Sequence, residues 1–265
     1  MKLQYSRLIS DLYGELLPKE ILKTQTEELK ATCQACIQVP HYNPSLKCCT
    51  FHPFLPNYLV GQILIDEKKK PSFITEVMKH KISNRLFVLP LGIVAPLQFQ
   101  VELEAMKKEK FGKALDWLCP YYDQAQNRCG IWQNRGSVCT SFYCESSKNL
   151  PGKKYWEKSL DYLSAIEMGL AEEALVRLDF TPRQVSGQLE FFNRTELSAQ
   201  EKKTNKLTSR TFNKLWNGIH DIEAFYVKTL EVVKSLKRQD VKVLMGEHGQ
   251  ALASELIRAG EIWKS

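Results

Sequence analysis

The sequence predicts a mainly α protein with a small β ribbon, in which a loop-rich, cysteine-ligated metal region packs on helices. Three observations support this prediction. Apolar residues recur every three or four positions over long stretches of the second half, which is the spacing of amphipathic helices. Residues 85–100 are rich in Leu, Val, Ile and Phe and are punctuated by Pro and Gly, which favours short strands. All eight cysteines lie within residues 33–144, and none follows.

The length and composition indicate a globular protein with one large or two modest domains. The chain has 265 residues, of which 43% are hydrophobic and 10% aromatic, and this is enough to build a sizeable core. We expect residues 1–150 to form a cysteine-cluster metal-binding region with flanking helices. Residues 151–265 are expected to form an α-helical region that packs on the first.

The helices of the first half are expected at residues 1–30, just after a turn at 51–61, at 72–81 and at 101–118, with two short strands in 85–100. The segment 37–43 should be loop, because prolines stand within and just after it. A linker at 145–152 precedes three long amphipathic patterns, at about 153–178, 206–237 and 240–263, with a shorter turn-rich piece at 181–196.

The N-terminal residues offer neither an uninterrupted apolar segment nor a small-residue cleavage site, so we expect no signal peptide. The longest nearly uncharged stretch, residues 86–101, is broken by Pro and Gly and is too short to span a bilayer. We therefore expect a cytoplasmic protein without a membrane partner. The formal net charge is +7, but the basic residues are dispersed, and this pattern does not favour nucleic acid as a partner.

The cysteines form two bursts. The first reads C-x2-C-x11-C-C and the second C-x9-C-x9-C-x4-C. Thiolates are preferred ligands of Zn²⁺ and of iron–sulfur clusters, which take four ligands per site, and a reducing cytosol disfavours disulfides. The sequence therefore predicts Zn or an iron–sulfur cluster held by Cys33, Cys36, Cys48, Cys49, Cys119, Cys129, Cys139 and Cys144. Disulfides or unrelated buried thiols are the alternative.

The spacing within the first burst indicates how the ligands are shared. Two residues between Cys33 and Cys36 allow both sulfurs to converge on one ion. Adjacent Cys48 and Cys49 cannot easily chelate one tetrahedral ion, so we expect them to serve different ions or a larger cluster, and the two bursts to interleave. His41 and His52 flank the burst and are the alternative ligands.

The second burst resembles the zinc- or iron-chelating cysteine-cluster domain of bacteria, often called the YkgJ-type or CxxCxxCC family. Its members carry a CxxC, a CC pair and a block like C-P-(x)n-C-x-I-Y-x-x-R-P-x-x-C-R-x-F-x-C. Here Ile131-Trp132 stands for Ile-Tyr, Arg135-Gly136 for Arg-Pro, and Cys139-Thr140-x-Phe142-x-Cys144 for Cys-Arg-x-Phe-x-Cys. Gly136 and Thr140 depart from the pattern, and the gap from Cys36 to Cys48 is longer than usual.

The resemblance covers roughly residues 30–145 and implies metal binding without implying a reaction. One relative of this cluster type, the flagellin lysine methylase, implies that some members carry an iron–sulfur centre and modify proteins. The chain itself has no dinucleotide-binding, P-loop, nucleophile-elbow or radical-SAM motif, and no catalytic residues are predicted. A metal-binding protein with a protein partner on its helical region and an iron–sulfur enzyme or redox sensor are the two hypotheses.

The residues around the second burst allow two interpretations. The aromatic residues are expected to form an apolar shell that excludes water from the sulfurs, or to stack on a substrate; they are Tyr121, Tyr122, Trp132, Phe142 and Tyr143. Arg135 is either a donor that offsets thiolate charge or a solvated side chain.

Overall fold

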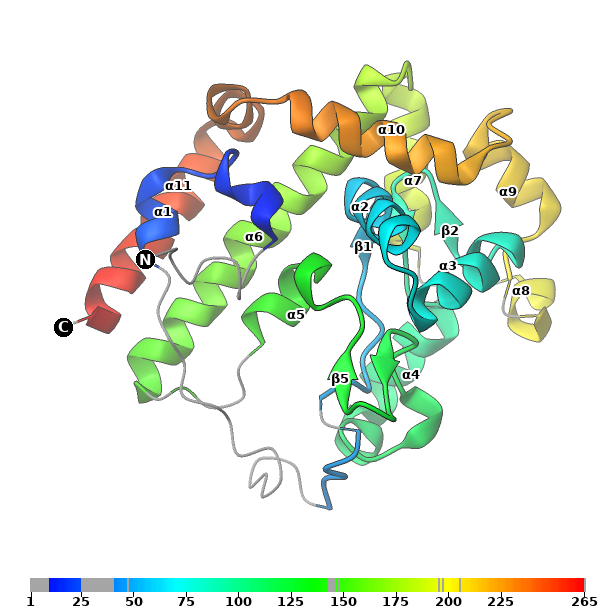
Figure 1. The fold of residues 1–265 in the computed structure, drawn as a ribbon, viewed down its shortest axis with the longest axis horizontal. Helices are drawn as coiled ribbons and strands as arrows, with labels where there is room; N and C mark the ends of the chain where they lie inside the picture. Colours follow the sequence, from blue (N-terminus) through cyan, green and yellow to red (C-terminus); the bar gives the residue numbers. More distant parts are fainter. Residues whose placement is uncertain are drawn as a thin grey trace.

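The computed structural model of the chain describes residues 10–264, apart from 25–40, 47, 143–145, 147, 195, 197 and 205. Helices dominate it and the strands are short and antiparallel, which confirms the predicted mainly α fold with a small β ribbon (Figure 1). None of the helices in this part of the chain is both long and apolar enough to cross a lipid bilayer.

The small sheet has three strands, β1 (Leu55–Pro56), β2 (Val88–Leu89) and β3 (Gly92–Ile93), in the order β1-β3-β2. The two strands expected in residues 85–100 are therefore confirmed. The third strand, β1, lies within residues 51–61, which were expected to form a turn. Gly92 has a φ of +149°, and a Cβ at this position would overlap the carbonyl oxygen of Leu55. Glycine is thus required where β3 passes β1.

The helices that precede the second burst are η2 (Asp11–Gly14), α1 (Lys19–Thr24), α2 (Asn57–Lys69), α3 (Phe73–Ser83), α4 (Leu97–Lys110) and η4 (Leu115–Trp117). The predictions of helices after the turn and at 72–81 are confirmed by α2 and α3. The helix expected over 1–30 is interrupted at Pro18, and its residues 1–9 and 25–30 lie outside the described residues.

The predicted helix over 101–118 is wrong in its bounds and in its face. It starts at Leu97, directly after Pro96, and ends at Lys110, because Gly112 takes a φ of +72°. Val101 and Leu115, which apolar spacing would place near one face of a helix over 101–118, are exposed. The spacing of apolar residues does not show that this helix ends before Gly112.

The second burst begins in a hairpin of β4 (Tyr122–Asp123) and β5 (Arg128–Cys129), followed by η5 (Trp132–Asn134) and α5 (Ser137–Ser141). The later helices are α6 (Asn149–Arg177), α7 (Pro182–Phe192), α8 (Ala199–Thr204), α9 (Ser209–Trp216), α10 (Ile222–Ser235) and α11 (Arg238–Lys264). Helix α6 thus begins inside the segment expected to be a linker.

Two other expectations for the second half need correction. The turn-rich piece at 181–196 contains helix α7, which is started by a capping box between Thr181 and Gln184. The pattern at 206–237 is two helices, because Asn217 adopts a φ of +47° and Asp221 caps the second one. Helix α11 matches the last pattern but is kinked at Gly246, where φ is +56°.

Residues from both sides of position 150 form one hydrophobic core. Figure 1 shows α10 lying over α2 and α11 running beside α6, and α5 packs on α6. A Cβ at Gly61 of α2 would overlap the carbonyl oxygen of Tyr226 in α10, so these two helices are in close contact. A smaller cluster of Ala95, Phe99 and Trp117 lies apart from this core.

Candidate functional site

Five of the eight predicted metal ligands lie in the described part of the chain. They are Cys48, Cys49, Cys119, Cys129 and Cys139; Cys119 is buried and the other four are partly buried. Cys33, Cys36 and Cys144 lie outside the described residues, so the C-x2-C half of the first burst is not part of the geometry that follows.

Four of these cysteines come from four different segments and lie near enough for their charges to act on one another. Cys49 precedes β1, Cys119 follows η4, Cys129 ends β5 and Cys139 is in α5. The backbone N–H of Cys119 donates a 2.7 Å hydrogen bond to the carbonyl oxygen of Cys49. We call Cys49, Cys119, Cys129 and Cys139 the cysteine cluster.

The thiols of the cysteine cluster act on one another through their charges. Burial raises the pKa of Cys119 well above its ordinary value, and negative charge on Cys139, Cys49 and Cys129 raises it further. The pKa of Cys139 rises to about 12, again through burial first and then through Cys129 and Cys49. Without a cation beside them, the thiols of Cys119 and Cys139 keep their protons at neutral pH.

Two backbone N–H groups point at sulfurs of the cluster. The amide of Tyr121 donates to Cys119 and the amide of Ile131 donates to Cys129, and each lowers the pKa of the thiol that it contacts. In both cases the donor lies two residues after the cysteine. Such bonds favour the thiolate over the thiol, and thiolate is the form that binds a metal.

Two cations flank the cluster. Lys81 of α3 is only 7% exposed, and its ammonium lies 5.6 Å from the centre of the Tyr121 ring. Burial lowers the pKa of Lys81 to about 8, and the negative charge of Cys119 acts in the opposite direction. Arg135 is buried, and its charge lowers the pKa of Cys129 and of Cys139. Arg135 is therefore not the solvated arginine that the sequence allowed.

A buried carboxyl group lies on the other side of Cys139. Burial raises the pKa of Glu167, in α6, to about 7, although hydrogen bonds from Ser137 and from Tyr13 favour its charged form. The Tyr13 hydroxyl lies 3.3 Å from the carboxylate and 2.7 Å from the Tyr58 hydroxyl. No pattern in the sequence predicts this network, because its members are far apart in the chain and stand at ordinary helical positions.

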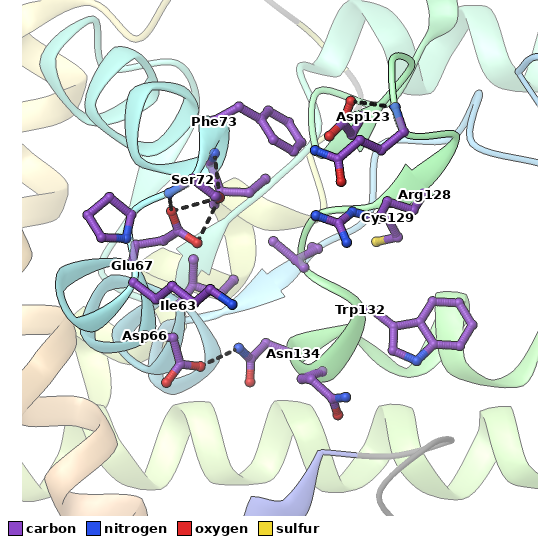
Figure 2. A pocket seen from close by; sticks show the side chains of 17 residues that line it. Ile63, Asp66, Glu67, Ser72, Phe73, Asp123, Arg128, Cys129, Trp132 and Asn134 are labelled. Carbon is purple, nitrogen blue, oxygen red and sulfur yellow. Dashed lines mark hydrogen bonds between the residues drawn. The ribbon is translucent and has the colours of Figure 1, made fainter.

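A pocket of about 900 Å³ opens beside the cluster (Figure 2). It lies between the end of α2, the start of α3 and the β4–β5 hairpin, and Cys129 is part of its wall. Hydrogen bonds already engage two carboxylates of the wall: Asp66 accepts from Asn134, and Glu67 accepts from Ser72. Figure 2 shows the Arg128 guanidinium directed into the pocket.

The expected aromatic shell is only partly formed. Tyr121 and Tyr122 are buried, whereas Trp132 and Phe142 are about half exposed, and Tyr143 lies outside the described residues. The guanidinium carbon of Arg135 lies 3.4 Å from the centre of the Trp132 ring. Trp132 therefore covers the arginine at the edge of the pocket while one side of its ring system meets solvent.

The histidines separate into one buried ring and four exposed ones. His52 packs near the cluster, whereas His41, His80, His220 and His248 are exposed.

The donor set of the cluster suits Zn²⁺ or an iron–sulfur centre, since it offers four sulfurs with flanking cations and N–H donors. Within the described residues, no three His, Cys, Asp or Glu side chains are arranged as a ready-made ion site. Comparison of the chain with protein-family models, with curated proteins and with solved structures found no match. The resemblance to the bacterial cysteine-cluster family therefore stays a prediction from the residues quoted above.

Proposed function

We propose that the chain is a metal-binding protein that holds Zn or an iron–sulfur cluster through its eight cysteines. One observation carries this proposal: four cysteines, distant in sequence, converge beside Lys81 and Arg135 with backbone N–H groups directed at two of them. The burial of Cys119 and the partial burial of Cys49, Cys129 and Cys139 would by themselves favour the neutral thiols. Cations and N–H donors around them instead favour thiolates, which a metal would stabilise.

Elemental analysis of the protein purified without oxygen tests this proposal. We expect either about two zinc atoms per chain and no acid-labile sulfide, or several iron atoms with matching sulfide. The matched control is the double variant Cys119→Ser/Cys129→Ser, which should lose metal. Equal, substoichiometric metal in both proteins would contradict metal binding by the cysteine cluster.

The second candidate is an iron–sulfur enzyme or redox sensor that modifies a protein partner. The pocket beside Cys129 favours it, because a purely structural metal site needs no opening next to a ligand. An absorption spectrum that bleaches on reduction by dithionite and returns in air would support this candidate. A colourless zinc protein that is inert to dithionite would eliminate it.

We propose a protein partner for the helical region 151–265 and a cytoplasmic location, with no membrane or nucleic-acid partner. Val243 and Ile262 are exposed apolar side chains of α11 and serve as the positions at which we probe this surface. Thiols at Cys119, Cys129 and Cys139 agree with a reducing compartment. A partner that binds the purified wild type but not the variant Val243→Lys/Ile262→Lys would support the surface, and equal binding would place the contact elsewhere.

A further inference from the structure

A second pocket lies between residues 16–20, helix α6 and helix α11. Its volume is about 370 Å³, and its wall includes Leu16, Tyr162 of α6 and the part of α11 from Arg238 to Ser254. Helices α1 and α6 both pack on α11 (Figure 1). The wall shares no residue with the pocket beside Cys129, so the two pockets are separate sites.

Helix α11 bends where it lines this pocket. Gly246 takes a φ of +56°, which interrupts the helical geometry between Met245 and Gly249, two residues of the wall. A Cβ at Gly249 would overlap the Met245 side chain, so the glycine leaves room for this flexible thioether. The bend thus shapes the wall, and methionine lets the wall adapt to what enters.

Tyr162 brings a nearly enclosed hydroxyl without a partner to this pocket. Its side chain is 2% exposed, and the hydroxyl makes no hydrogen bond within the described part of the chain. The oxygen is not sealed in the core, so its small accessible area faces the pocket that the residue lines. Burial holds the pKa of Tyr162 well above its ordinary value, so the phenol stays a neutral donor. An enclosed polar group without a partner is destabilising, and a ligand that accepts its hydrogen bond would remove this cost.

The remaining wall is largely apolar. Leu16 and Val241 are buried, and Pro18, Met245 and Ala253 line the pocket with them. A cavity of about 150 Å³ is enough to hold benzene, so this pocket has room for a ligand of roughly twice that size. Its size and lining therefore suit a small ligand with an apolar body.

The charged groups of the wall favour an anion. They are Arg238 and Lys242, with Glu20 as the single carboxylate among the described residues of the wall. The Arg238 guanidinium donates to the carbonyl oxygens of Leu17 and Gly14, which fixes its position. A guanidinium has five N–H donors, so these two bonds leave others for a ligand.

We propose that this pocket binds a small carboxylate with an apolar body, which accepts a hydrogen bond from the Tyr162 hydroxyl and whose charge is compensated by Arg238 and Lys242. An ionised carboxylate is an acceptor only, so it complements a wall whose unused groups are donors. The inference goes beyond the proposed function, since it requires neither the metal nor the cysteine cluster.

Calorimetric titration of the full chain with octanoate, octanol and acetate tests the proposal. Octanoate has both the charge and the apolar body, whereas octanol lacks the charge and acetate lacks the body. We expect saturable one-to-one binding of octanoate, at least about tenfold weaker binding of octanol, and no binding of acetate in the same concentration range. Absence of saturable octanoate binding, or equal affinities for octanoate and octanol, would overturn the proposal.

Variants of the wall locate the bound octanoate. Tyr162→Phe removes only the hydroxyl and should weaken octanoate binding about tenfold. Lys242→Gln, at an exposed position, should weaken the binding of octanoate but not that of octanol. The matched control is Lys228→Gln on α10, also exposed, which should bind both as the wild type does. Wild-type affinity for octanoate in both Tyr162→Phe and Lys242→Gln would place the ligand elsewhere and overturn this site.

Discussion

The backbone N–H of Cys119 donates to the carbonyl oxygen of Cys49 at 2.7 Å, which joins the two cysteine bursts through their main chains. A cysteine of the first burst thereby lies among three cysteines of the second. This placement agrees with the expectation, drawn from the adjacent Cys48 and Cys49, that the bursts interleave. Metal binding by these residues stays a prediction. Substitution of the adjacent cysteines Cys48 and Cys49 tests it.

If Cys48 and Cys49 bind different metal ions, the metal content of double variants should distinguish the two sites. Cys49→Ser and Cys129→Ser each remove a ligand of the cysteine cluster, so combining them should release no more metal than either change alone. Cys48→Ser combined with Cys129→Ser should release more, because it damages both sites. Metal per chain by elemental analysis is the measurement, and identical losses in the two double variants would show that the pair is not divided.

Lys81→Met should change stability in opposite directions in the metal-free and metal-loaded protein. At pH 7 the buried Lys81 ammonium, with its pKa lowered from 10.5 to about 8, costs the metal-free fold up to roughly 3 kcal/mol. The full cost applies below pH 8 and fades between pH 8 and 10.5. In the loaded protein the same ammonium offsets thiolate charge, so its removal should lower the melting temperature.

The control for Lys81 is Lys79→Met, an exposed position of the same helix α3, which should have little effect in either state. Melting curves of both variants with and without metal provide the comparison. A shift of the same sign in the two states would show that Lys81 does not compensate charge at the cysteine cluster.

The candidate site was predictable from the sequence where one residue type carries the chemistry. Cysteine spacing predicts the candidate ligands, whose ligation stays a prediction, and the adjacent pair led us to expect that Cys49 lies near the second burst, as its hydrogen bond with Cys119 agrees. The charges that control the thiols were not predictable, because Lys81 lies on an ordinary helical face and Glu167 lies within a long helix. Their role comes from tertiary packing, which places them near Cys119 and Cys139.

The fold was predictable where hydrophobic periodicity is long, as in α6 and α11. The predicted helix bounds are wrong at residues whose own backbone conformation ends or bends a helix. Gly112, Asn217 and Gly246 all have positive φ, and each ends or kinks a helix that apolar spacing alone would continue. Helix α7 was missed because a capping box, rather than a long apolar stripe, defines its start.

Glu167→Gln should remove a pH dependence of stability in the metal-free protein. The Glu167 pKa is raised from 4.5 to about 7 by burial, so the folded state binds a proton more tightly than the unfolded one. Its stabilising contribution is complete below pH 4.5 and is lost as the pH rises to 7. Relative to the variant, the wild type should therefore lose on the order of 3 kcal/mol across this interval.

Urea unfolding at pH 5, 6, 7 and 8 measures this difference. Glu157→Gln, at an exposed position of the same helix α6, is the matched control and should follow the wild type. A difference between wild type and Glu167→Gln that stays constant from pH 5 to pH 8 would contradict the buried, protonated state of Glu167.

Gly61→Ala should destabilise the whole protein and not only its helical half. A Cβ at Gly61 would overlap the Tyr226 carbonyl and push α2 away from α10, at an expected cost of about 3 kcal/mol. Gly187→Ala in α7, where a Cβ meets nothing within 4 Å, should instead stabilise by roughly 0.5–1 kcal/mol. Because one core joins both halves, metal release and tryptophan fluorescence should change in a single urea transition in both variants. Separate transitions would show that residues 1–150 and 151–265 unfold independently.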